Sequence, residues 1–159
     1  NGNRAAETLR IFATCFCSTN SFHLNGDQCT GEYSSFRYRP FTLEGNFAFA
    51  SGVQEMLLQS HDGIIRLFPA VPDSWRAVSF KNFRTEGAFL ITAVRADGRL
   101  KDMKVTSEQG GTFTMKNTFN KFGVKGADAE LSADGLLVIN TKPGQQFTLF
   151  EKSASNSAK

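Results

Sequence analysis

Several features are scarce or missing in this chain of 159 residues, and each absence excludes a class of protein. No run of about 18 apolar residues occurs, which argues against a membrane-spanning helix. The net charge is only +3 and the lysines and arginines are scattered, so the basic stripe of a nucleic-acid-binding protein is missing. No signal peptide opens the chain, and residues 1–7 lead directly into a helical pattern. We expect such a start in a fragment of a longer protein.

Cysteine and histidine are also few. Cys15 and Cys17 form a C-x-C pair, which is not a zinc spacing, and only Cys29 follows. His23 and His61 are too few to complete a metal site, so no metal or cofactor is predicted. Two thiol states stay open: one disulfide to Cys29 with one thiol left over, or three buried thiols.

The aromatic residues are unevenly distributed, with two Tyr and one Trp against sixteen Phe. Because Phe is a core and interface residue, we expect a large buried aromatic surface, either within the chain or against a partner. The part of the chain after residue 63 holds Trp75 and no Tyr, so it offers little aromatic platform for stacking on sugars.

The first part of the sequence, up to about residue 63, has helical patterns. Apolar residues recur at helical spacing over residues 4–16, and a polar, turn-rich loop follows over residues 18–39. A second helix is predicted over residues 46–61, with Gly63 as its stop. That helix is apolar nearly all round, so we expect it to be buried between elements that two helices alone do not supply.

From Ile64 onward the pattern is that of β-strands. Segments rich in Val, Ile, Phe and Thr predict strands over residues 78–85, 88–96, 99–108, 111–117, 136–142 and 146–152. Asp-Gly turns at residues 96–99 and 132–135 connect strands, which together predicts a small antiparallel sandwich. The fold class is therefore α+β, with a helical domain over residues 1–63 and a β-sandwich over 64–152. Residues 153–159 lack an apolar anchor and are predicted to be disordered.

Three motifs in one order carry a resemblance to a known family. FTLEGNFAFASGVQEMLLQSH (41–61) is followed by DGIIRLFPAVPDSW (62–75) and then by NFRTEGAF (82–89). These segments resemble the C-terminal part of glycoside hydrolase family 95, the inverting α-L-fucosidase family. The resemblance is dense over about residues 41–98 and thinner elsewhere.

The resemblance implies a fold and a function. The family fold is an (α/α)6 barrel between two β domains, so residues 1–63 look like the last barrel helices and the rest like the C-terminal β domain. The intact protein would hydrolyse fucosylated or related glycans with inversion, in the periplasm or after secretion. The implied partners are the carbohydrate substrate and the upstream barrel domain of the same parent protein.

The resemblance also singles out Glu44. The family has Asp at this position, before Gly-Asn-Phe, on the general-base side of the inverting pair, so Glu44 is the candidate general base. Inverting enzymes hold two carboxyl groups roughly 6.5–9.5 Å apart, and a misplacement of about 1 Å can cost on the order of 100-fold in rate. The longer Glu side chain changes that geometry. Without the resemblance, Glu44 is a carboxylate favoured by the dipole at a helix N-terminus.

Four further residues are weaker candidates for substrate binding: Asn46, His23, Tyr38 and Arg39. Asn46 is also a candidate N-cap, and the other three are equally explained by packing within the loop.

Because the chain holds at most one half of the carboxyl pair, we expect it to be inactive alone. The alternative is a non-catalytic β-sandwich module that binds carbohydrate or scaffolds a barrel domain. A third hypothesis is a stand-alone structural domain without a sugar role.

Overall fold

The computed structural model describes residues 1–152, so the predicted disordered tail at 153–159 lies outside the described residues. The chain forms two compact units, each described by itself. The helical unit comprises Asn1–Leu57 together with Pro69–Pro72. The β unit comprises Leu58–Phe68 and the chain from Asp73 onward.

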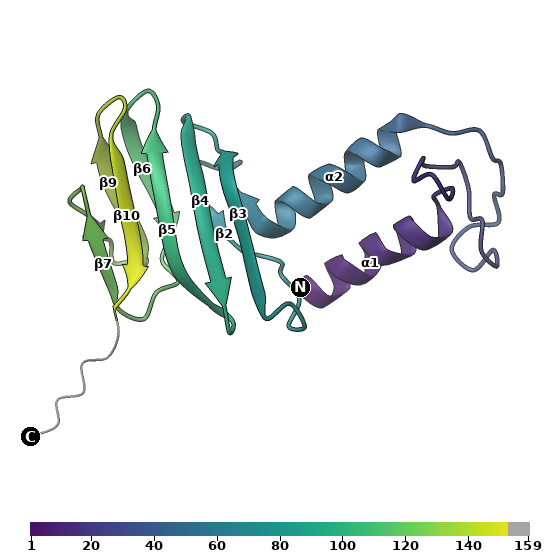
Figure 1. Cartoon of the computed structure of the whole chain (residues 1–159), viewed down its shortest axis with the longest axis horizontal. Coiled ribbons are helices and arrows are strands. Elements are labelled where there is room, and N and C mark those ends of the chain that lie inside the picture. The colour runs from purple at the N-terminus through teal and green to yellow at the C-terminus, as the bar shows by residue number, and fades with distance from the viewer. Residues whose placement is uncertain (153–159) are drawn as a thin grey trace, which may run out of the picture. The chain divides into compact units, whose positions relative to one another are not determined.

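Both predicted helices are present, with shifted ends (Figure 1). Helix α1 spans Gly2–Cys15, and helix α2 spans Leu43–Leu57 instead of the predicted 46–61. The last predicted turn of α2 is missing because Leu58 and Gln59 leave the helix as strand β1, which pairs with β2, Arg66–Leu67. Gly63, with φ of 74°, lies in the connection between these strands and does not terminate the helix.

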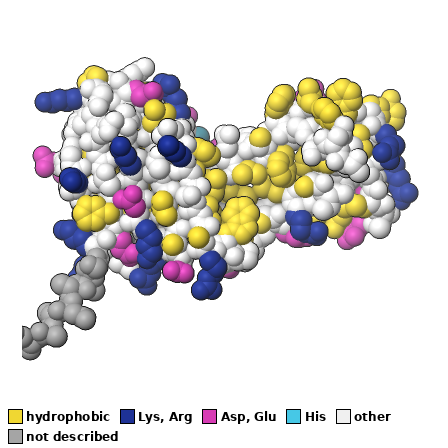
Figure 2. All heavy atoms as spheres, in the orientation of Figure 1, with side chains coloured by type: hydrophobic (Ala, Val, Ile, Leu, Met, Phe, Trp, Pro, Cys, Tyr) yellow, Lys and Arg dark blue, Asp and Glu magenta, His cyan; other side chains and the backbone are white. Residues whose placement is uncertain are grey.

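The two helices pack through a narrow contact. The rings of Phe12 and Phe49 stack with centroids 5.5 Å apart, and a Cβ at Gly52 would lie 3.2 Å from the Leu9 side chain. Only Met56 and Leu57 of α2 are buried. The predicted burial of the whole helix is therefore not achieved within residues 1–152, and Phe47 is 68% exposed. Figure 2 shows hydrophobic side chains at the surface of the helical unit.

The loop between the helices is fastened by a disulfide between Cys15 and Cys29, which leaves Cys17 as a free thiol. Asp27 organises the same loop from a buried position, because its carboxylate accepts hydrogen bonds from the backbone N–H groups of Tyr33 (3.0 Å) and Cys29 (2.7 Å). The N–H of Tyr33 makes the largest contribution to lowering the pKa of Asp27 below its usual value.

The β unit holds the predicted antiparallel sheets (Figure 1). The larger sheet has five strands, in the order β3 (Ala77–Arg84), β4 (Phe89–Ala96), β5 (Arg99–Ser107), β10 (Gln146–Glu151), β7 (Phe122–Lys125). The smaller sheet has three strands, in the order β6 (Gly111–Lys116), β9 (Leu136–Thr141), β8 (Glu130–Leu131). Together with the two helices, these sheets confirm the α+β class.

The core of the β unit is built from the side chains that alternate inward along these strands. Phe113 of the smaller sheet meets Phe89 and Phe147 of the larger one edge-on, with ring centroids 5.3 and 5.2 Å apart. These contacts account for part of the Phe surplus, since edge-to-face rings combine large burial with a favourable quadrupole geometry. Both predicted Asp-Gly turns are also present, one between β4 and β5 with positive φ at Asp97 (50°) and Gly98 (75°), and one between β8 and β9 with positive φ at Gly135 (73°).

Within residues 1–152, no helix is long and apolar enough to cross a membrane.

Candidate functional site

The candidate site lies at the first turn of α2 and the loop that packs on it. Glu44 is the acidic residue of this turn, and its side chain is exposed. No hydrogen bond or ion pair within residues 1–152 engages its carboxylate. Its carboxylate is therefore accessible to water, as a general base must be.

Asn46 joins this turn of the helix to the loop. Its Oδ1 accepts from the backbone N–H of His23 at 2.9 Å, and its Nδ2 donates to the carbonyl of Ser21 at 2.7 Å. The alternative that Asn46 is the N-cap is wrong, because α2 has already begun at Leu43. Asn46 is a brace between segments more than 20 residues apart, with both ends of its amide occupied.

His23 is held tightly on three sides. Its Nδ1 shares a hydrogen bond of 2.5 Å with Oγ1 of Thr42, and its ring stacks on Phe12 with centroids 5.1 Å apart. A Cβ at Gly45 would lie 2.4 Å from Cγ and Nδ1 of the imidazole. Only glycine at position 45 lets the helix backbone approach the ring this closely.

The other two substrate-binding candidates lie elsewhere on the loop. Tyr38 and Arg39 are both exposed, and the Tyr38 ring packs against Phe36 with centroids 5.7 Å apart. The structure thus brings His23 and Asn46 together beside the turn that carries Glu44. Among the described residues, no hydrogen bond, ion pair or ring contact joins Tyr38 or Arg39 to them.

Sequence reasoning missed three residues of this region. Thr42 and Gly45 position the His23 ring, and Asp27 holds the loop. Asp27 had a readable signal, since Asp in a turn-rich segment often accepts a hydrogen bond from the backbone two residues on, as it does here from Cys29. The Thr42 contact had none, because it joins residues 19 apart in a segment without regular periodicity.

One cluster in this loop has the composition of a metal site. Ligand atoms of Cys15, Asp27 and Cys29 lie within 4.8 Å of one another. The two sulfurs are joined as a disulfide, so neither is available as a thiolate ligand. Both Asp27 oxygens accept backbone hydrogen bonds, so this cluster is structural. The disulfide also decides between the two thiol states that the sequence left open. Partial burial raises the pKa of the remaining thiol, Cys17.

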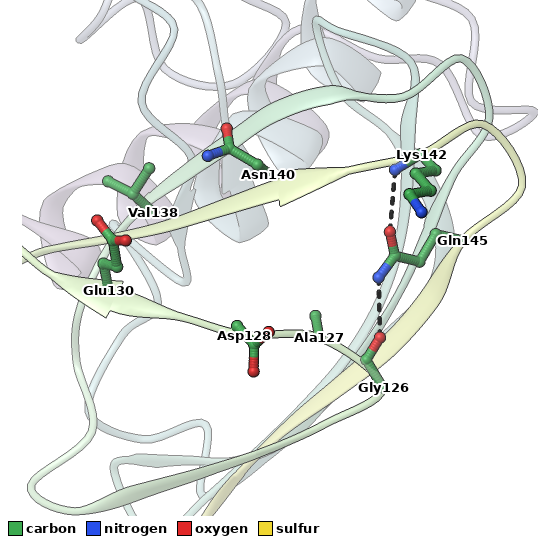
Figure 3. A pocket seen from close by; sticks show the side chains of 8 residues that line it. All are labelled: Gly126, Ala127, Asp128, Glu130, Val138, Asn140, Lys142 and Gln145. Atoms are coloured by element: carbon green, nitrogen blue, oxygen red, sulfur yellow. Dashed lines mark hydrogen bonds between the residues drawn. The ribbon is translucent and has the colours of Figure 1, made fainter.

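The β unit carries a shallow polar groove of about 660 Å³ (Figure 3). The side-chain amide of Gln145 spans it, accepting from the backbone N–H of Lys142 and donating to the carbonyl of Gly126. Asn140 accepts from the Thr112 hydroxyl, and the carboxylates of Asp128 and Glu130 point in different directions. The polar groups do not converge on one point, so this groove is not a built binding site.

Helices that bear an exposed carboxylate in one turn, followed by an antiparallel sandwich, are compatible with a carbohydrate-active enzyme that ends in a β domain. Residues 59–149, more than half of the chain, match the model of the glycoside hydrolase family 95, C-terminal domain. The chain belongs to glycoside hydrolase family 95. The match extends to β10, well beyond the segment where the motifs are dense, and it begins after α2.

A curated relative agrees with this assignment. The chain is 34% identical over 82 residues to "Alpha-L-fucosidase 2" of Arabidopsis thaliana. The aligned segment is 50% of this chain but 10% of that protein. The chain thus spans only about a tenth of the length of the relative that it matches.

Proposed function

We propose that this chain is the C-terminal part of an inverting glycoside hydrolase that acts on fucosylated or related glycans, with Glu44 as the general base. The observation that carries the proposal is the exposed, unengaged carboxylate of Glu44, on a helix turn that Asn46 fixes to the loop. Family membership and the similarity to a fucosidase support the reaction class and the sugar.

In this mechanism Glu44 takes a proton from the attacking water, while a general acid upstream of this chain protonates the leaving oxygen. The cluster of His23, Thr42 and Asn46 supplies no second carboxyl group. The chain alone is therefore inactive. His23 uses Nδ1 for Thr42, and no hydrogen bond within residues 1–152 engages its Nε2, which we assign to a sugar hydroxyl. Tyr38 and Arg39, exposed on the same loop, are assigned weaker sugar contacts.

The remaining helices of the (α/α)6 barrel would lie upstream in the parent protein, and residues up to about 63 would complete the barrel. The exposed apolar side chains of α2 support this arrangement, because neighbouring apolar side chains that face water mark an interaction surface, and Leu43 and Phe47 are both exposed one helical turn apart. A cavity of about 520 Å³ between α1 and α2, lined in part by Leu9, Gly52 and Met56, is a further apolar surface for the barrel to cover.

We further propose that the protein works in the periplasm or outside the cell. The Cys15–Cys29 disulfide supports this location, because disulfides persist mainly in oxidising compartments.

An immunoblot of the source cells with antibody to this chain tests the proposal, together with hydrolysis assays. We expect a band several times larger than 17.5 kDa, cleavage of an aryl α-L-fucoside by that parent protein, and none by the isolated chain. A single band at the size of the chain would contradict the proposal, as would a parent inactive on fucosides and related glycosides.

A further inference from the structure

A second cavity of the β unit has a different character from the groove in Figure 3. Its volume is about 350 Å³, at the lower end of the range for small-molecule sites. It lies where the β4–β5 hairpin, the end of β10 and the β6–β7 connection meet. Its polar lining is Arg95, Arg99, Thr118, Asn120 and Glu151, and Leu67, Phe68 and Leu100 line the apolar side.

Arg95 is the central feature of this cavity. Its side chain is half-buried, and Nη1 donates to the carbonyl of Trp75 at 3.2 Å. No carboxylate in the described part of the chain forms an ion pair with it. A guanidinium carries five N–H donors in a planar fork, so one hydrogen bond leaves most of the donors of Arg95 available to a ligand.

The charges around Arg95 leave a positive surplus. Arg99 approaches Glu151 at 3.9 Å, but the same carboxylate binds Lys101 more closely, at 3.0 Å. Asp97, in the adjacent turn, lies 4.0 Å from Arg76. Glu151, the one carboxylate in the lining of this cavity, is therefore shared by Arg99 and Lys101, and Arg95 adds a positive charge without an ion-pair partner within residues 1–152.

Two unusual backbone conformations lie beside the cavity. Asp97 and Gly98 form the tight turn that separates Arg95 from Arg99. Phe68 adopts a left-handed φ of 54°, which is costly for an aromatic residue, and its ring packs on Phe80 with centroids 5.4 Å apart. Such backbone outliers persist only where the surrounding structure fixes them, and they cluster at ligand sites.

We propose that this cavity binds an oxyanion carried on a sugar, either the carboxylate of a uronate or a sulfate ester. The forks of Arg95 and Arg99 take the oxyanion in bidentate fashion, which is the geometry that planar guanidinium groups favour. Thr118 and Asn120 bond ring hydroxyls, and the apolar side contacts the sugar ring. This mode of binding needs no aromatic platform. That the ligand is a sugar rests on the proposed function, whereas the preference for an oxyanion rests on the cavity alone.

Titration of the ¹⁵N-labelled, full 159-residue chain by two-dimensional NMR at low salt tests this proposal. The probes are methyl glucuronoside, glucose 6-sulfate, neutral methyl glucoside, and inorganic sulfate. We expect at least one of the two charged sugars to shift the amides of Gly98 and Asn120, and to bind at least tenfold more tightly than methyl glucoside and inorganic sulfate. The tighter of the two charged sugars identifies the natural oxyanion.

Arg95→Gln should weaken binding of the charged sugar about tenfold or more, since a hydrogen bond to a charged group is lost. Arg99→Gln gives the same test at a side chain that is 63% exposed, so this variant should fold like the wild type. Arg84→Gln is the matched control, because Arg84 pairs with Glu108 outside the cavity and should not change binding.

Equal binding of methyl glucoside would overturn the proposal, and so would no shift at Gly98 and Asn120 with either charged sugar. Unchanged binding of the charged sugar by both Arg95→Gln and Arg99→Gln would also overturn the proposal. If inorganic sulfate bound as tightly as the charged sugar, the claim that the ligand is a sugar would be wrong. The titration involves no hydrolysis, so a parent protein without glycosidase activity leaves its result intact. Failure to bind, in turn, leaves the role of Glu44 untouched.

Discussion

The side-chain amide of Asn46 holds two points of a distant loop at once, His23 through its N–H at 2.9 Å and Ser21 through its carbonyl at 2.7 Å. These two hydrogen bonds fix the first turn of α2 to the loop. Glu44 lies on that turn, two residues from the brace, so its position depends on Asn46.

Replacing Asn46 by Ala should therefore loosen residues 21–23 and lower the free energy of unfolding by about 1–3 kcal/mol, because two backbone groups lose their partners. Urea unfolding measures the loss, and hydrogen exchange at His23 locates it. Asn25→Ala is the matched control, since Asn25 is exposed and should change stability by less than about 0.5 kcal/mol. If both variants lowered the free energy of unfolding equally, Asn46 would not be the residue that fixes the loop to the helix.

Gly45→Ala should displace the His23 ring, because the new Cβ would lie 2.4 Å from Cγ and Nδ1. We expect a destabilisation of about 1–3 kcal/mol from this overpacking, together with a shift of the His23 ring resonances. Gly52→Ala is the comparison on the same helix, where the neighbour is the flexible end of Leu9 at 3.2 Å. Gly52→Ala should cost less, and a cost as large as that of Gly45→Ala would argue against the close approach.

The Cys15–Cys29 disulfide closes a loop with a sequence separation of 14 residues. Cys29→Ser should lower the free energy of unfolding by roughly 2–4 kcal/mol under oxidising conditions, measured by thermal unfolding with and without dithiothreitol. Cys17→Ser, which removes the free thiol, should leave the effect of dithiothreitol intact. A wild-type melting temperature that dithiothreitol does not change would contradict the pairing.

The lowered pKa of Asp27 should make the local stability of the loop depend on pH. Its pKa is lowered in the folded chain by backbone N–H groups, so its contribution to stability is complete above the unfolded value of about 3.9 and is lost as pH falls through the lower folded pKa. We expect hydrogen-exchange protection at Cys29 and Tyr33 to fall when the pH is lowered from 5 to below 4.

Asp27→Asn should reduce this protection at pH 5 and flatten its pH dependence. Asp62→Asn is the control, because Arg66 lowers the pKa of Asp62 to about 2 in a different unit of the chain. If Asp62→Asn rather than Asp27→Asn removed the acid response at Cys29 and Tyr33, the assignment would be wrong.

Sequence patterns predicted the main elements because those elements depend on local periodicity. Alternation identified the long strands, such as β4 and β5, and the Asp-Gly pair identified the turn at Asp97. The short strands β7 and β8 were missed because two to four residues hold too little pattern. The end of α2 was misplaced because pairing of Leu58 with Leu67 competes with the helix, and no local signal reports it.

The candidate site was only partly predictable. The resemblance pointed to Glu44 and Asn46, but the contacts of His23 with Thr42, Phe12 and Asn46 join three separate segments. Such contacts are tertiary and leave no spacing in the sequence.

The most direct test of the account is the turnover number of the intact parent protein carrying Glu44→Gln. General acid–base catalysis contributes typically 100- to 10,000-fold, so we predict at least a 100-fold fall in kcat on a fucosylated substrate with an unchanged unfolding transition. Glu55→Gln, the same change further along α2, should leave kcat within a few-fold of the wild type. Wild-type turnover by Glu44→Gln would remove Glu44 from the mechanism.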